Sequence, residues 1–141
     1  MDFSDRSINY RQVFFQSNKP ILGKYYFCAY CGRLLNKKNV TVDHLYPVSA
    51  AKKSFWIRTR LKSKGLKTIN DKRNLVPACI SCNKTKAAHM GLWIIKGRLG
   101  RYKGLWLLRH TFRLILIVTT IILLFKSNTF GQIKSLIYHI L

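Results

Sequence analysis

The chain has almost no acidic residues. It contains no glutamate and only four aspartates, Asp2, Asp5, Asp43 and Asp71, against 26 lysines and arginines, which gives a formal net charge of +22. Such a charge predicts an anionic partner, with nucleic acid as the first expectation and an anionic membrane surface or an acidic protein as alternatives. Because carboxylates are so scarce, the one that lies beside a histidine, Asp43, invites a specific role.

An export signal and an odd cysteine are also missing. Residues 1–20 contain charged side chains and no long apolar run, so they do not have the pattern of a secretory signal. The four cysteines form two Cys-x-x-Cys pairs with none left over. In a chain that is not secreted, reduced thiolates on a metal ion are favoured over disulfides. The sequence therefore predicts a protein of the cytoplasm or of an organelle matrix.

The cysteine pairs have the spacing of a structural zinc site. Cys28 and Cys31 precede Cys79 and Cys82 by about 50 residues, and each pair can present two sulfurs from one tight turn to a tetrahedral Zn²⁺ ion. A site with four thiolates leaves no position open for water, so its role is structural. Free thiols or an iron-sulfur centre are the alternatives.

Between the two pairs, an Asp-His dipeptide ends a predicted strand. The segment 40–47 alternates in the manner of a β-strand, contains Asp43 and His44, and stops at Pro47. Histidine is the natural general base near neutral pH, and a carboxylate is a hard oxygen ligand suited to Mg²⁺ or Mn²⁺. Alternatively, this is only a strand end with a hydrogen-bonded histidine.

Taken in order, these elements resemble a known enzyme family. The pattern CxxC … DHxxP … NLxxxCxxCNxxK, which covers about residues 25–90, resembles the HNH endonucleases with a four-cysteine zinc knot. The resemblance implies an α+β fold, a small ββα-metal (treble-clef-like) finger in which two strands are followed by a helix. Many relatives have a glycine soon after the proline of the DHxxP element, and this chain has Val48-Ser49 instead.

The resemblance also implies roles for individual residues. His44 would be the general base that activates water, and Asn74 would brace the loop and orient His44, so these two form the catalytic set. Asp43 and Asn83 would hold a catalytic Mg²⁺ or Mn²⁺, with asparagine where many relatives have histidine. Lys86 would contact a phosphate.

Basic residues concentrate in segment 52–73, between the two halves of the expected site. There we favour phosphate binding over a merely solvated loop. The hydrophobic residues Phe55, Trp56 and Ile57 are expected to anchor this segment to the core, with base stacking as the alternative. The predicted nucleic-acid contacts are Lys52, Lys53, Arg58, Arg60, Lys62, Lys64, Lys67, Arg73, Lys84 and Lys86.

The C-terminal part changes character. Residues 1–24 are expected to be an N-terminal arm, 25–90 the nuclease domain, 91–104 a basic glycine-containing linker and 105–141 an apolar helical tail. The unbroken apolar run 114–125 would extend only about 18 Å as a helix, short of the roughly 30 Å of a bilayer core. Extension back to Leu105 gives enough length but includes Arg109 and Arg113, which could snorkel. Membrane contact and packing against protein both remain open for this tail.

Two functions are consistent with the sequence. The first is an Mg²⁺-dependent HNH endonuclease, a hydrolase that cuts phosphodiester bonds of double-stranded DNA. The second is a non-catalytic basic zinc-finger subunit of a larger nucleoprotein or membrane assembly. The retained set of Asp43, His44 and Asn83 favours the enzyme, because a scaffold has no physical need for a base and two metal ligands.

Overall fold

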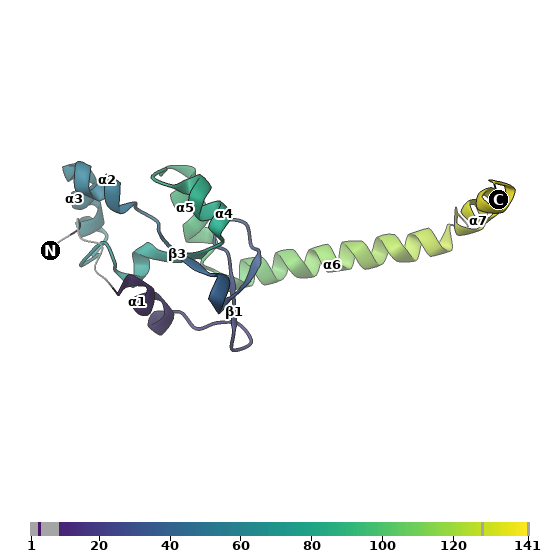
Figure 1. The fold of residues 1–141 in the computed structure, drawn as a ribbon, viewed down its shortest axis with the longest axis horizontal. Helices are drawn as coiled ribbons and strands as arrows, with labels where there is room; N and C mark the ends of the chain where they lie inside the picture. The colour runs from purple at the N-terminus through teal and green to yellow at the C-terminus, as the bar shows by residue number, and fades with distance from the viewer. Residues whose placement is uncertain (1–2, 4–8, 128, 141) are drawn as a thin grey trace. The chain divides into compact units, whose positions relative to one another are not determined.

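The computed structural model describes residues 3, 9–127 and 129–140, which form two compact units. Unit 1 is Met1–Lys103 and unit 2 is Gly104–Leu141. The order of the helices and strands along the chain can be followed by colour in Figure 1. Of the expected N-terminal arm, 1–24, the structure describes Phe3, which is buried, and residues 9–24, which include helix α1 (Tyr10–Ser17).

Two small antiparallel sheets form the centre of unit 1. Strand β1 (Tyr25–Phe27) pairs with β2 (Leu34–Asn36), and β3 (Thr41–His44) pairs with β4 (Leu75–Ala78). The register of the second pair places Asp43 opposite Val76 and His44 opposite Leu75. Together with the helices, these sheets confirm the mixed helix-and-strand class that the sequence predicts. Strand β3 is shorter than the predicted strand 40–47: it ends at His44, and Pro47 is the N-cap of the following helix.

The segment between β3 and β4 is helical rather than an extended basic loop. It contains α2 (Val48–Lys53), α3 (Phe55–Ser63) and a 3₁₀ turn, η2 (Lys72–Asn74). Ser54 caps α3, because its side chain accepts a hydrogen bond from the backbone N–H of Ile57. Leu61 and Ile69 are fully buried and attach the segment to the core.

The expected aromatic anchors of this segment are wrong in part. Phe55 and Trp56 are 66% and 80% exposed, and only Ile57 packs against the core. The reason is helical geometry: in α3, the side of the helix that faces the core is occupied by Ile57 and Leu61, which are four residues apart. The two aromatic rings therefore remain on the surface, edge to face, with centroids 6.2 Å apart.

The expected flexible linker 91–104 is also not what the structure contains. It holds helix α5 (Leu92–Leu99), which packs through two glycines. A Cβ atom at Gly97 would lie 2.3 Å from a methyl carbon of Leu45, and one at Gly100 would lie 1.8 Å from the carbonyl oxygen of Ala29. These glycines therefore serve close packing rather than flexibility, and α5 belongs to unit 1.

Strand β4 leads into α4 (Ile80–Lys86), and two further helices form the C-terminal part of the chain. Helix α6 (Lys103–Lys126) has 24 residues and α7 (Thr129–Ile140) has 12. Within the described part of the chain, α6 is the one helix that is long and apolar enough, by length and composition, to cross a membrane. None of its apolar window is buried inside the protein.

Candidate metal and catalytic site

The four cysteines come together as the sequence predicts. Their Sγ atoms all lie within 4.8 Å of one another, and those of Cys31 and Cys79 are 4.0 Å apart. A tetrahedral ion with Zn–S bonds of about 2.3 Å places its sulfurs about 3.8 Å apart, so the cluster fits such an ion closely. The four cysteines could therefore hold a structural metal such as zinc.

Local backbone geometry arranges these sulfurs. Cys79 is the N-cap of α4, and its Sγ accepts a hydrogen bond from the backbone N–H of Cys82 at 3.4 Å. The N–H of Cys79 in turn donates to Sγ of Cys28, also at 3.4 Å. Burial raises the pKa of the Cys28 thiol to about 11. A bound cation would offset this cost, because it stabilises the thiolate directly.

A cavity of about 460 Å³ lies in the same unit, and it is lined by residues from three elements. Asp43 and His44 come from β3, Lys52 comes from α2, and Asn83 comes from α4. These are the predicted general base, both predicted ligands of the catalytic metal and one predicted phosphate contact. We call this the Asp43–His44 cavity.

Asp43 is held from two sides. The phenol O–H of Tyr30 donates to its Oδ2 atom, and the ammonium of Lys86 lies 3.0 Å from the same oxygen. Both of these contacts are made to Oδ2. Among the described residues, every fully buried side-chain oxygen has a hydrogen-bond partner, so the other oxygen of Asp43, Oδ1, keeps access to solvent although Asp43 as a whole is only 8% exposed. Burial and the charge of Asp43 raise the pKa of Tyr30, which therefore acts as a neutral donor.

Lys86 is not the surface phosphate contact that the sequence predicts. Its side chain is completely buried, and besides Asp43 it donates to the backbone carbonyl of His44 at 2.7 Å. A buried ammonium needs such partners, since removing a charge from water costs several kcal/mol. Lys86 thus fixes the two central residues of the cavity rather than reaching a ligand.

The ring of His44 is oriented by a residue that the sequence analysis did not select. Nε2 of His44 lies 2.9 Å from Oδ1 of Asn70, and the ring of Tyr10 packs nearby with a centroid separation of 5.1 Å. Because an amide oxygen only accepts hydrogen bonds, a neutral His44 ring in this geometry has its proton on Nε2 and its lone pair on Nδ1. This tautomer is the one that a base acting through Nδ1 requires.

Asn74 braces the surrounding backbone instead. Its Oδ1 accepts from the N–H of Tyr46, and its Nδ2 donates to the carbonyls of Tyr46 and Ile69 at 3.2 and 2.8 Å. Its own carbonyl accepts from the N–H of Leu45. The bracing half of its predicted role agrees with this geometry, whereas the contact to the His44 ring belongs to Asn70.

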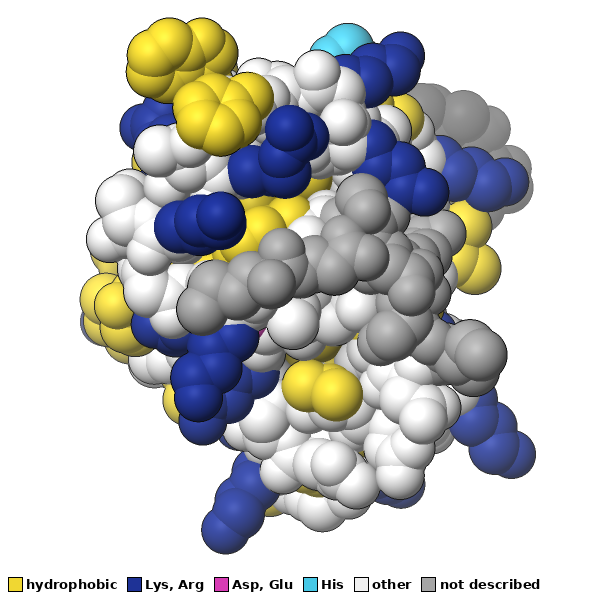
Figure 2. Space-filling view, turned by 90° about the vertical axis from the view of Figure 1, so that its left-hand side faces the viewer, with side chains coloured by type: hydrophobic (Ala, Val, Ile, Leu, Met, Phe, Trp, Pro, Cys, Tyr) yellow, Lys and Arg dark blue, Asp and Glu magenta, His cyan; other side chains and the backbone are white. Residues whose placement is uncertain are grey.

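The remaining predicted contacts are mostly on the surface. Lys52, Lys53, Arg60, Lys62, Lys64, Lys67 and Lys84 are exposed, Arg58 is partly buried, and Arg73 forms an ion pair with Asp71. Lysine and arginine side chains are spread over the face of the molecule in Figure 2, where acidic side chains are almost invisible. The sequence would not have revealed Tyr30 or Asn70, because neither residue type nor spacing distinguishes them.

Comparisons with protein-family models, with curated proteins and with solved structures give no match.

Proposed function

We propose that the protein is a metal-dependent endonuclease of the HNH type that hydrolyses phosphodiester bonds of double-stranded DNA. The observation that carries this proposal is the Asp43–His44 cavity, in which a histidine base, a carboxylate and a carboxamide meet beside a four-cysteine cluster. The arrangement of β3, β4 and α4 is consistent with a treble-clef-like ββα-metal finger. The strong positive charge favours a polyanionic substrate.

The chain's own residues support a hydrolytic step. His44, held by Asn70 in the tautomer with a lone pair on Nδ1, would take the proton of the attacking water. Lys52 lines the cavity and would contact the phosphate. Oδ1 of Asp43 and the side-chain oxygen of Asn83 are hard ligands that fit Mg²⁺ or Mn²⁺, which would stabilise negative charge on the leaving oxygen.

One observation favours the alternative function, a non-catalytic basic zinc-finger subunit. The carboxylate of Asp43 already has a buried cation, Lys86, as its partner. An ion pair of this kind neutralises the charge that would attract a metal ion. The enzyme remains our first proposal because Oδ1 of Asp43 makes no such pair and Asp43 lines the same cavity as His44 and Asn83.

Nicking of supercoiled plasmid by the full chain in non-ionic detergent, with and without added Mg²⁺, tests the enzyme. His44→Ala should lower the nicking rate by about 10²–10⁴-fold, the usual contribution of a general base. His89→Ala is the matched control, because His89 is an exposed histidine outside the cavity, and it should leave the rate unchanged. Mg²⁺-independent nicking, or full activity of His44→Ala, would contradict the proposal.

We further propose that α6 holds this enzyme at a membrane. As a helix, its 24 residues extend about 36 Å, enough for a bilayer core of roughly 30 Å. In the apolar run 114–125 the hydrophobic side chains are exposed, among them Ile115 at 58% and Phe125 at 67%, and a helical segment that is apolar on every side suits a membrane. The residues that precede it would then remain on the cytoplasmic or matrix side, since they are strongly basic.

The charged residues near the start of α6 fit this placement. The guanidinium of Arg109 lies over the ring of Trp106, 5.4 Å from its centroid, so its side chain is directed toward the N-terminal end of the helix. An arginine that extends toward the membrane surface in this way can keep its charge in water.

A further inference from the structure

A second cavity of unit 1 is larger and more basic than the first. Its volume is about 600 Å³, within the range of small-molecule sites, and its lining includes Tyr46, Lys64, Arg73, Arg98, Arg101 and Tyr102. Leu45 and Tyr46 line this cavity, whereas His44 and Pro47 line the Asp43–His44 cavity. The two cavities therefore share one short stretch of backbone.

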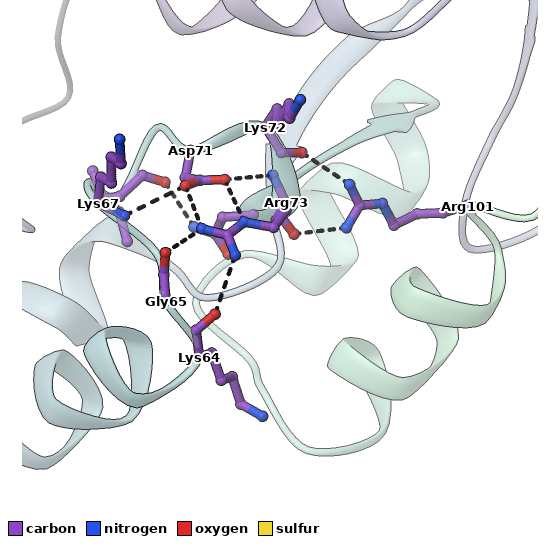
Figure 3. A network of polar contacts seen from close by, with 9 residues as sticks. Lys64, Gly65, Lys67, Asp71, Lys72, Arg73 and Arg101 are labelled. Carbon is purple, nitrogen blue, oxygen red and sulfur yellow. Dashed lines mark hydrogen bonds and ion pairs between the residues drawn. The ribbon is translucent and has the colours of Figure 1, made fainter.

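Neutral groups position two of its arginines. Arg101 donates to the backbone carbonyls of Arg73 and Lys72 at 2.7 and 2.9 Å, as Figure 3 shows, and Arg98 donates to the hydroxyl of Tyr46 at 3.0 Å. Burial lowers the pKa of Arg101, and the charge of Arg98 acts in the same direction. Their guanidinium groups are thus held in place with donors to spare.

Carboxylate partners are missing for most of these cations. In the described part of the chain there are two aspartates, and they are paired with Lys86 and with Arg73. Within those same ranges, Lys64 and Arg98 form no ion pair, and Arg101 is influenced by the charge of Asp71 without pairing with it. Three positive charges around one cavity repel each other, and an anion from outside would relieve that repulsion.

The uncharged residues that line this cavity indicate which kind of molecule carries the anionic group. Tyr102 is 71% exposed and Leu99 is 54% exposed, so an aromatic ring and an aliphatic side chain border the cations. Arginine binds phosphate well because its donors form a planar fork, and exposed aromatic rings stack on nucleic-acid bases. A carboxylate ligand would need the cations but not the ring.

We propose that this second cavity is a nucleotide subsite, in which Lys64, Arg98 and Arg101 bind a phosphate and Tyr102 stacks on the attached base. The inference rests on the proposed function, because the nucleotide would flank the bond cut in the Asp43–His44 cavity, with its base unpaired from the duplex so that it can stack on Tyr102. A free mononucleotide carries the same chemistry and is the other source of such a ligand. The shared backbone 43–47 would couple the two cavities.

Binding of a short fluorescein-labelled oligothymidylate tests the subsite. The full chain is used in non-ionic detergent without Mg²⁺, and every variant carries His44→Ala, so the result does not depend on cleavage. Lys64→Gln with Arg98→Gln should weaken binding about tenfold or more, the usual effect of losing charged hydrogen bonds. Arg98→Gln also removes the contacts of Arg98 with the hydroxyl and ring of Tyr46, so zinc content and circular dichroism verify that the fold survives.

Matched controls separate the subsite from general charge. Lys19→Gln with Lys38→Gln removes the same charge from exposed positions outside the cavity and should weaken binding about twofold or less. Tyr102→Leu should weaken binding at least about fivefold, whereas Tyr138→Leu, at an 89% exposed position, should not change it. Cavity variants that bind no worse than their controls would overturn the proposal.

Competitors identify the source of the nucleotide. Displacement of the probe by thymidine monophosphate, lost in Lys64→Gln with Arg98→Gln, supports a subsite that accepts a free mononucleotide. Displacement by unlabelled oligothymidylate alone supports a flanking nucleotide of the nucleic acid. Equal displacement by polyglutamate would overturn the proposal in favour of an acidic protein. If the variants change binding as expected but the protein does not nick plasmid, the nucleotide subsite is supported and the proposed nuclease activity is contradicted.

Discussion

Unit 1 and unit 2 differ in how far their apolar side chains are buried. Phe14, Leu61 and Leu75 of unit 1 are completely buried, around a cysteine cluster that could hold a metal ion. In unit 2, Ile117 and Leu123 are 55% and 60% exposed. Unit 1 thus buries apolar side chains within itself, around cysteines that could hold a metal ion, whereas the apolar run 114–125 of unit 2 leaves its side chains exposed and suits an apolar environment such as a membrane.

The largest effect should come from removing one cysteine. Cys79→Ser deletes one sulfur of the four-cysteine cluster that could hold zinc, and with it the cap of α4; binding of structural zinc provides about 10–16 kcal/mol in small zinc-finger peptides. Unit 1 should therefore unfold, while α6 remains helical in detergent. Zinc stoichiometry and near-ultraviolet circular dichroism measure the first result, and far-ultraviolet circular dichroism the second. If Cys79→Ser still folds and binds zinc, a metal ion held by the four cysteines does not explain why unit 1 is stable.

A smaller effect is expected from the buried ion pair. Lys86→Met leaves the carboxylate of Asp43 without its cation, and breaking a buried pair in this way costs about 3–5 kcal/mol. Lys84→Met is the control, because Lys84 is exposed on the same helix, and its effect should stay within about 0.5 kcal/mol. Urea unfolding followed by tryptophan fluorescence measures both. Equal stabilities would mean that the pair is not important for the fold of unit 1.

Unit 2 should respond to a charge in the middle of α6. Ile117→Lys should reduce membrane insertion by about 2.5–3.5 kcal/mol, the cost of a lysine at the centre of a spanning helix. Leu22→Lys introduces the same charge at an 86% exposed position of unit 1 and should have no effect. Flotation with lipid vesicles and resistance to alkaline extraction measure insertion. If Ile117→Lys inserts as well as the unaltered protein, α6 does not cross the bilayer.

The smallest effect concerns the exposed ion pair of unit 1. Hydrogen bonds from Arg73 lower the pKa of Asp71 to about 2, from 3.8. Because the folded-state pKa is the lower one, the contribution to stability is present above about pH 4 and is lost as the pH falls toward 2. It should not exceed about 1 kcal/mol, since Arg73 is 47% exposed. The difference in unfolding free energy between the unaltered protein and Asp71→Asn should therefore shrink over this range, and a constant difference would contradict the shift.

The sequence predicts those parts of the molecule that depend on short spacings. Each Cys-x-x-Cys pair forms one turn, so the cysteine cluster follows once the two turns meet. The strand that ends at Asp43 and His44 follows from β-branched residues and from Pro47. The mixed helix-and-strand class, in contrast, is implied by the resemblance to a family and not by these local rules.

Long-range packing decides the rest. Asn70 and Asn74 are four residues apart, and only the tertiary structure determines which one bonds to His44. Lysine is rarely buried, so the position of Lys86 depends on the presence of Asp43 beside it. Gly97 and Gly100 resemble linker glycines in the sequence, although Leu45 and the backbone of Ala29 pack against them.

The spacing of the cysteines also has a consequence in time. The second pair follows the first by 51 residues, and Lys86 follows Asp43 by 43, counted along the chain (79 − 28 and 86 − 43). At about 5–20 residues per second, a ribosome needs several seconds after the first cysteine pair and Asp43 to synthesise the second cysteine pair and Lys86. During that interval the nascent chain holds two unpaired thiols and a lone aspartate. All four cysteines, Asp43 and Lys86 are synthesised before α6, so the order of translation favours folding of basic unit 1 ahead of the apolar helix.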